Sequence, residues 1–332
     1  MILVRSPLRI SFVGGGSDLP AFCEENTGSV VSSAIDKFVY VMVGEREDFN
    51  IRVSYNETEF VRDGVGAIRH DTVREALRWA GIEGGIEIVS MAGLPAKAGL
   101  GSSGAFAAAL VQAILVRRNS FYSPNVVTGL VNYLEIDRCK KPCGYQDQTA
   151  SAFGGIAWYR FHGQDFSRDD LSAGNVQDLF ERLLLVDVSA YGPSNKILRR
   201  QAERVSTGVG RSDTQAMANL AGAFRDAFLS GDLDECGEIV DASWSLKKSF
   251  DSEMSNELYD QLLVFSKRRG AIGGKLCGAG GRGMFLLFCS EGEREHIAEE
   301  VGHLLAFRTI SPQFCPLGTQ TLWADSSWAL HA

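Results

Sequence analysis

The sequence lacks the features of a membrane protein, a secreted protein or a general nucleic-acid binder. No apolar run approaches the roughly 20 residues that a membrane-spanning helix needs, and residues 1–13 lack the charged segment and apolar core of a signal peptide. Lys and Arg number 33 against 41 Asp and Glu, so the net charge is −8. Phosphate-backbone affinity comes from clustered Lys and Arg, so this balance argues against broad nucleic-acid binding. We expect a cytoplasmic protein with no membrane or nucleic-acid partner.

The cysteines are irregularly spaced, and the sequence has few prolines. The seven cysteines are scattered and odd in number, which argues against a disulfide scaffold. Cys139 and Cys143 form the one close pair, but no second pair and no nearby His completes a tetrahedral metal set. With 45% hydrophobic residues, 22% charged residues and 8 prolines, the composition is ordinarily globular. The length of 332 residues favours about two domains.

Strand and helix patterns alternate along the chain without a repeat. Strands are expected at 2–13, 38–44, 51–55, 85–92, 182–190, 284–289 and 319–324. Helices are expected at 71–80, 105–115, 124–139 and 291–306, and mainly helical chain from 194 to 269. This order predicts a mixed α and β protein with a domain boundary near residue 190.

Two glycine-rich stretches have the spacing GxGxxG, namely GLGSSG at 99–104 and GAGGRG at 278–283. A dinucleotide-binding motif also needs an acidic residue about 20 positions later, and residues 120–125 contain none. The second stretch runs into a strand instead of opening a helix. A Walker P-loop needs Ser or Thr after GK, whereas Lys275 is followed by Leu276. Both of these nucleotide motifs are therefore excluded.

Residues 95–104 nevertheless have the chemistry of a phosphate loop. Glycines let the backbone approach an anion, and the helix that follows directs its free amides and positive end toward it. Ser102 and Ser103 could bind phosphate oxygens, ligate a divalent cation or cap the helix. Glu135 could supply the cation's second protein oxygen, although solvation is the simpler explanation for an isolated Glu at a helix end.

Three motifs in order resemble those of the GHMP kinases, the family of galactokinase, homoserine kinase, mevalonate kinase and phosphomevalonate kinase. They are RISFVGGGSDLPAF at 9–22, PAKAGLGSSGAF at 95–106 and KLCGAGGRGMFLLF at 275–288. Within the family, GGGSDLP, SYNETE at 54–59 and GYQDQ at 144–148 most resemble kinases of D-glycero-D-manno-heptose 7-phosphate, which act on its anomeric hydroxyl. These elements span nearly the whole chain.

The resemblance implies an α+β, two-domain GHMP kinase fold with the active site between the domains. The first domain, 1–190, would be an α/β ATP-binding domain with a left-handed βαβ crossover. The second, 191–332, would be ferredoxin-like.

The resemblance also implies roles for individual residues and two cofactors, ATP and Mg²⁺. Asp147 and Arg9 would be catalytic. The ATP phosphates would lie on Pro95, Gly99, Leu100, Gly101, Ser102, Ser103 and Gly104, with Mg²⁺ held by Ser103 and Glu135. A sugar or sugar phosphate would contact Gly15, Gly16, Ser17, Asp18, Gly144, Ser194, Gly280 and Gly281.

Elementary chemistry agrees with these roles. Phosphoryl transfer needs an oriented hydroxyl and neutralisation of charge around the moving group. Asp147 can take or orient the hydroxyl proton, and Arg9 can keep that carboxylate ionised. Without the motif context, Asp147 would be a turn residue, Arg9 a surface charge and Asp18 a helix cap.

One segment departs from the heptose kinase pattern. Where those kinases carry Ser-Arg and further hydroxyls, this chain has AYGPSNKIL at 190–198 and no matching arginine. Ser194, Asn195 and Lys196 could still meet a polar or phosphorylated substrate. The alternative acceptors are another sugar, a cyclitol, or a compound of the mevalonate or homoserine type. The alternative to a kinase is an inactive protein that binds sugar and ATP as a sensor. A homodimer is also left open.

Overall fold

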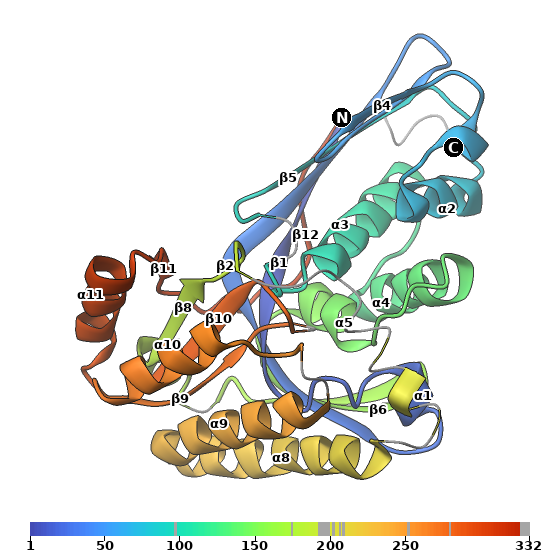
Figure 1. The fold of residues 1–332 in the computed structure, drawn as a ribbon. Coiled ribbons are helices and arrows are strands. Elements are labelled where there is room, and N and C mark those ends of the chain that lie inside the picture. The colour runs from blue at the N-terminus through green and yellow to red at the C-terminus, as the bar shows by residue number, and fades with distance from the viewer. Residues whose placement is uncertain are drawn as a thin grey trace.

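The computed structural model describes residues 1–95, 98–173, 175–191, 200, 203–205, 207, 210–250, 253–278 and 280–325. Within them the chain forms two sheets (Figure 1). The larger contains β1 (Ile2–Val13), β2 (Gly28–Glu45), β3 (Ile51–Ser54), β4 (Thr58–Val61), β5 (Ile86–Ala92), β6 (Ile156–His162), β7 (Asp165–Asp170) and β12 (Gln320–Ala324). The smaller contains β8 (Leu183–Asp187), β9 (Ala271–Leu276), β10 (Met284–Cys289) and β11 (Thr309–Ile310).

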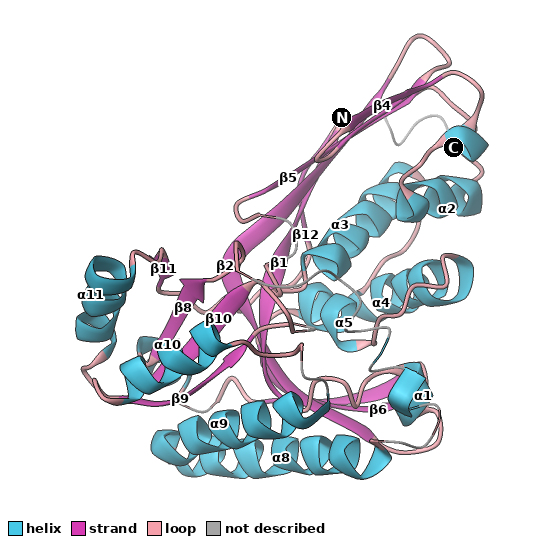
Figure 2. Ribbon diagram, in the orientation of Figure 1, coloured by secondary structure: helices cyan, strands magenta, loops and turns pink. Residues whose placement is uncertain are grey.

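The helices are grouped by their place in the chain, before or after β8. The first group is α1 (Pro20–Cys23), η1 (Val65–Ala67), α2 (Asp71–Ala80), α3 (Ser102–Arg117), α4 (Pro124–Asn132), the π-helical η2 (Tyr133–Arg138), α5 (Gln146–Phe153) and α6 (Val176–Glu181). The second is α8 (Arg211–Ser230), α9 (Leu233–Phe250), α10 (Glu257–Lys267) and α11 (Arg294–Leu305). Figure 2 shows α2, α3, α4 and α5 together beside the larger sheet.

The larger sheet has the strand order β12-β1-β2-β5-β3-β4, and the long strands β1 and β2 lie at its centre. The strand β2 is long enough to pair with β1 and β5, and its first half also pairs with β6. Most pairs are antiparallel, but β3 and β5 are parallel because α2 lies between them in the chain. The β1 and β2 side chains are mostly buried, as the apolar run at 2–13 predicts.

The helix α3 forms the core of the larger unit. Its residues from Gly104 to Leu115 are all buried, and it lies along the long strands with α2, α4 and α5 nearby (Figure 1). The uniformly apolar 105–115 segment predicts this burial, because a helix that is apolar all round needs protein on every side. The first turn of α3 is thereby fixed at the end of the GLGSSG loop.

The smaller sheet has the order β11-β8-β10-β9, and all its pairs are antiparallel. With α9 between β8 and β9 and α11 between β10 and β11, this is the ferredoxin-like arrangement that the resemblance implies. The strand β8 precedes residue 190, and β12 returns to the larger sheet beside β1. If the chain is divided by its sheets, the second unit therefore begins before β8, and β12 belongs to the first unit.

The structure confirms most of the expected elements and adds some, but residues 194–199 of the expected helical chain lie outside the described residues. The expected helix at 124–139 is α4 followed by a π-helical turn, and the helix expected at 105–115 begins earlier, at Ser102. The hairpin of β6 and β7 is not anticipated by the sequence reasoning. Among the described helices, none is long and apolar enough to cross a membrane.

Candidate active site

A cleft of about 250 Å³ lies where the three sequence motifs meet. The first motif supplies Arg9, Ser11, Gly15, Gly16, Asp18 and Leu19, the second Gly99, Gly101, Ser102 and Ser103, and the third Lys275, Gly278, Gly280 and Arg282. The remaining lining residues are Cys143, Gly144, Gln146, Asp147 and Lys247. Segments far apart in sequence thus build one polar cleft between the larger and smaller sheets.

Asp147 and Arg9 form an ion pair in this cleft. Asp147 stands in the first turn of α5, and Arg9 extends from β1. The arginine donates to Asp147 Oδ1 from Nε at 2.9 Å and from Nη2 at 2.6 Å. Arg9 is 3% exposed, whereas the Asp147 side chain is 34% exposed. The carboxylate is therefore held by a buried cation while it faces the cleft.

Arg9 also binds the glycine loop. Its Nη1 donates to the Gly99 carbonyl at 2.9 Å, and its backbone N–H donates to the Leu100 carbonyl at 3.0 Å. Gly99 and Gly101 have positive φ angles of 78° and 74°, and a Cβ at Gly101 would lie 3.0 Å from Arg9 Cγ. Glycine is required here because the backbone turns left-handed against the arginine.

The start of α3 packs directly on Asp147. A Cβ at Gly104 would lie 2.8 Å from Asp147 Cβ. This close approach sets the carboxylate beside the free amides of the helix N-terminus, where an anion is favoured. Gly101 is the N-cap, and no side chain caps this helix. Ser102 and Ser103 are the first two residues of the helix, so neither occupies its N-cap position.

The third motif closes on the second. A Cβ at Gly99 would lie 2.4 Å from the Cys277 carbonyl oxygen, and a Cβ at Gly278 would lie 2.6 Å from Gly99 Cα. The Met284 N–H also donates to the Ala98 carbonyl at 2.9 Å. These contacts join the smaller sheet to the phosphate-type loop of the larger unit.

Asp18 occupies a different environment in the same cleft. It is 2% exposed. Its Oδ1 accepts from the Gly16 N–H at 2.9 Å and from Gln146 Nε2 at 3.0 Å, and its Oδ2 accepts from the Gln146 N–H at 3.2 Å. Burial raises the pKa of this carboxyl, although the backbone hydrogen bonds oppose the shift.

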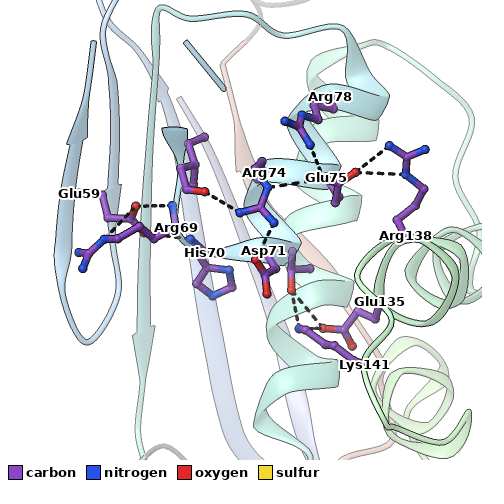
Figure 3. A network of polar contacts seen from close by, with 12 residues as sticks. Glu59, Arg69, His70, Asp71, Arg74, Glu75, Arg78, Glu135, Arg138 and Lys141 are labelled. Atoms are coloured by element: carbon purple, nitrogen blue, oxygen red, sulfur yellow. Dashed lines mark hydrogen bonds and ion pairs between the residues drawn. The ribbon is translucent and has the colours of Figure 1, made fainter. Parts of the chain in front are cut away.

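Ser103 and Glu135 come together as the metal-site prediction requires. Ser103 Oγ lies 3.4 Å from Glu135 Oε1, which also accepts from Thr72 Oγ1 at 3.2 Å. Lys141 Nζ lies 2.5 Å from the same oxygen (Figure 3). Although burial lowers the pKa of Lys141, the charge and hydrogen bond of Glu135 raise it overall.

These residues fit a hard divalent cation. A hydroxyl and a carboxylate are the oxygen ligands that Mg²⁺ takes alongside water and phosphate. Lys141 already supplies a positive charge at this carboxylate, so an arriving cation would compete with an ammonium group. Among the described residues, no cluster of three His, Cys, Asp or Glu forms a metal site made by protein alone.

An ion-pair network holds the Glu135 turn in position. Arg138, on the same π-helical turn, donates to Glu75 of α2 at 2.9 Å and 3.1 Å (Figure 3). Thr72, which contacts Glu135, is also on α2. Helix α2 thus contacts two side chains of this turn, Arg138 and Glu135.

Some predicted site residues do not line the cleft. Pro95 is exposed, Leu100 is buried, and Gly281 accepts from the Tyr259 hydroxyl. Ser17 is fully buried, with its hydroxyl bonded to the Gly14 and Ser29 carbonyls. Ser194, Asn195 and Lys196 lie outside the described residues.

Sequence reasoning missed three lysines at the site, the half-buried Lys141 and the buried Lys247 and Lys275. Lys141 and Lys247 lie outside the three motifs, so only the fold brings them to the site. Lys275 Nζ donates to the Ser11 and Phe12 carbonyls at 3.0 Å and 2.8 Å, joining β9 to β1. The presence of Lys275 inside the third motif was the one available signal.

The chain matches the models of two protein families. Residues 65–155 match the family described as GHMP kinases N terminal domain, and residues 224–305 match the one described as GHMP kinases C terminal. Together they span more than half of the chain, in the order that the three motifs have. The chain belongs to the GHMP kinase family and is a phosphotransferase with the two-domain fold of that family.

Two curated proteins are similar to this chain at low sequence identity. A bifunctional fucokinase/GDP-fucose pyrophosphorylase of Arabidopsis thaliana is 28% identical over 88% of this chain, which spans only 30% of that relative's length. The D-glycero-alpha-D-manno-heptose 7-phosphate kinase of Campylobacter jejuni is 22% identical over 86% of this chain and 89% of its own.

Solved structures share the fold. A D-glycero-D-manno-heptose 1-phosphate kinase from Bacteroides thetaiotaomicron has a TM-score of 0.80 at 18% identity, covering 98% of this chain and 100% of its own. The galactose complex of Lactococcus lactis galactokinase has a TM-score of 0.73 at 19% identity, covering 97% and 95%.

Proposed function

We propose that this protein is an ATP-dependent sugar kinase that transfers the γ-phosphoryl group to a sugar hydroxyl. The observation that carries the proposal is the Asp147–Arg9 pair, packed directly against the glycine loop that opens α3. A carboxylate that faces a cleft beside an anion-binding helix start suits a hydroxyl acceptor and a phosphate donor together.

In this proposal, Asp147 Oδ1 stays bonded to Arg9, and Oδ2 accepts the proton of the acceptor hydroxyl. The hydroxyl oxygen forms a bond to the γ-phosphorus as the bond to the β–γ bridging oxygen breaks. The backbone of residues 99–104 would bind the phosphates, and Ser103 with Glu135 would hold Mg²⁺. The metal ion would neutralise phosphate charge when bound.

A polyhydroxylated acceptor suits the other side of the cleft. Besides the Asp18 carboxylate, three buried polar atoms of lining residues have no hydrogen-bond partner, Ser11 Oγ, Gln146 Oε1 and Arg282 Nε. Unpaired buried acceptors and donors are costly unless a ligand completes them. Sugar hydroxyls can donate to the carboxylate and amide oxygens and accept from the serine.

The finer proposal is the anomeric hydroxyl of D-glycero-D-manno-heptose 7-phosphate, which would give the 1,7-bisphosphate. The motif resemblance at GGGSDLP and GYQDQ and the Campylobacter relative support it. A non-phosphorylated sugar is the second candidate. The higher identity to a relative named as a fucokinase and the missing arginine at 190–198 favour that candidate.

An acceptor screen tests both proposals. The purified protein, ATP and Mg²⁺ are incubated with heptose 7-phosphate, free heptoses, fucose, other hexoses, cyclitols, mevalonate and homoserine. ATP consumption is followed, and products are identified by phosphorus NMR. An anomeric phosphate on the heptose phosphate supports the finer proposal, and turnover of a free sugar alone replaces it with the second. Turnover of mevalonate or homoserine alone contradicts the sugar kinase assignment.

A further inference from the structure

Lys247 is a buried cation whose charge no carboxylate balances. It lies in the last turn of α9, is 4% exposed and reaches the cleft wall. Its Nζ donates to the carbonyl of Gly278, in the third motif. Among the described residues, that carbonyl is its hydrogen-bond acceptor, and no carboxylate lies within ion-pair distance. An ammonium has three N–H donors, so capacity for a ligand remains.

Three of the other cations near the cleft have assigned partners, whereas Arg282, which also lines it, has a buried Nε without one. Arg9 is paired with Asp147, and Lys141 with Glu135. Lys275 donates to two backbone carbonyls of β1, which explains its position structurally. Lys247 differs because its single acceptor belongs to a loop that borders the cleft. Keeping such a charge dry without a partner is unfavourable, and burial lowers the pKa of Lys247 to about 8.

The neighbours of Lys247 indicate where a ligand charge would lie. Lys247 lines the same cleft as Asp18, Asp147 and Arg9, and all three are close enough to interact with it electrostatically. Lys275 of β9 and Cys277 of the third motif also interact with it electrostatically. In the proposed function the phosphoryl group passes between the loop at 99–104 and Asp147, and Lys247 lines the cleft that contains both.

We propose that the Lys247 ammonium binds a non-bridging oxygen of the transferring phosphoryl group and offsets its negative charge during transfer. This inference rests on the proposed kinase function. The bond between the acceptor oxygen and the γ-phosphorus forms, the bond to the bridging oxygen of the leaving ADP breaks, and the acceptor proton goes to Asp147. Lys247 keeps its three protons throughout and acts by charge alone. The smaller sheet unit thereby contributes a catalytic residue through α9.

Kinetics of matched variants test the charge. Lys247→Met is expected to lower kcat by a factor of about 100, as loss of a transition-state donor does, with KM for ATP and acceptor changed far less. Lys247→Arg is expected to restore part of kcat. Methylammonium is expected to raise the activity of Lys247→Ala. The control is Lys248→Met, because Lys248 is adjacent on α9 but points away to Asp260 at 2.9 Å.

Lysine NMR supplies a test that needs no acceptor. The Lys247 side-chain signal is titrated with pH alone and then with tripolyphosphate and Mg²⁺. The inference predicts that the polyanion raises the Lys247 pKa, while Lys248 titrates unchanged. An unchanged Lys247 titration, or full kcat in Lys247→Met when the wild type turns over, overturns the inference. If the wild type phosphorylates nothing while the titration shifts, the kinase assignment fails and anion binding by Lys247 stands.

Discussion

Asp147 and Asp18 lie in the same cleft but in contrasting surroundings. Asp147 is partly exposed and paired with a buried arginine, whereas Asp18 is buried and held by the amides of Gly16 and Gln146. A carboxylate with a cation on one oxygen and an open face suits proton transfer. A buried carboxylate held on both oxygens suits precise orientation of hydroxyls. Under the proposed function, this difference suits Asp147 to the chemistry and Asp18 to positioning of the acceptor.

Asp147→Asn should break the chemical half of this comparison. The amide keeps the size of the side chain but cannot take a proton, so turnover should fall by about two orders of magnitude or more. Nucleotide affinity, measured by calorimetry, should stay nearly intact because the loop at 99–104 is unchanged. Wild-type turnover in this variant would exclude Asp147 as the general base.

Asp18→Asn should affect the positioning half instead. We expect KM for the acceptor to rise by about tenfold, roughly the effect of one lost charged hydrogen bond, with a smaller change in kcat. Steady-state kinetics with a saturating nucleotide would measure both. A fall in kcat equal to that of Asp147→Asn, with KM unchanged, would contradict the division of roles.

Variants at the proposed Mg²⁺ site of Ser103 and Glu135 should have smaller effects, which raise or lower the Mg²⁺ requirement. Ser103→Ala removes an oxygen ligand, so half-maximal activity should need several-fold more Mg²⁺. Lys141→Met removes the ammonium that occupies Glu135, so it should need less. Calorimetric Mg²⁺ titration in the presence of a non-hydrolysable ATP analogue provides a second readout. Two titrations identical to the wild type would count against this corner as the metal site.

The pH dependence of stability should separate Asp18 from ordinary surface carboxylates. Because burial raises its pKa above the ordinary 3.8, the native state holds the Asp18 proton more tightly than the unfolded state. The contribution of Asp18 to the free energy of unfolding therefore falls as pH rises from 3.8 through the native-state pKa of this carboxyl. Asp18→Asn removes this loss, so the stability of the variant relative to wild type should increase from about pH 4 upward. Urea unfolding at several pH values measures the difference, and a constant difference would exclude the shift.

Much of this account was accessible from the sequence because its signals are local. The loop at 99–104 requires glycine for its left-handed turns, and Asp147 lies in a motif with Gly144, whose Cβ would collide with Asp18 Oδ2 at 1.9 Å. Such steric requirements appear directly as residue types at fixed spacing. The strands at 2–13 and 284–289 and the helix at 105–115 were likewise evident from apolar patterning.

Other features depend on tertiary packing and leave no local signal. Lys247 reads as one of two adjacent lysines on an amphipathic helix, and only the packing of α9 turns it toward the cleft while Lys248 meets Asp260. Ser17 carries a motif position but satisfies the backbone of β2 instead of a ligand. The return of β12 to β1 also depends on long-range pairing.

The most direct test is a crystal structure of Asp147→Asn bound to Mg²⁺, ATP and the acceptor found by the screen. The account predicts that the reacting hydroxyl lies within hydrogen-bond distance of residue 147 and in line with the γ-phosphorus, with other sugar hydroxyls on Asp18. A hydroxyl positioned on another side chain, with residue 147 remote from the γ-phosphoryl group, would contradict it.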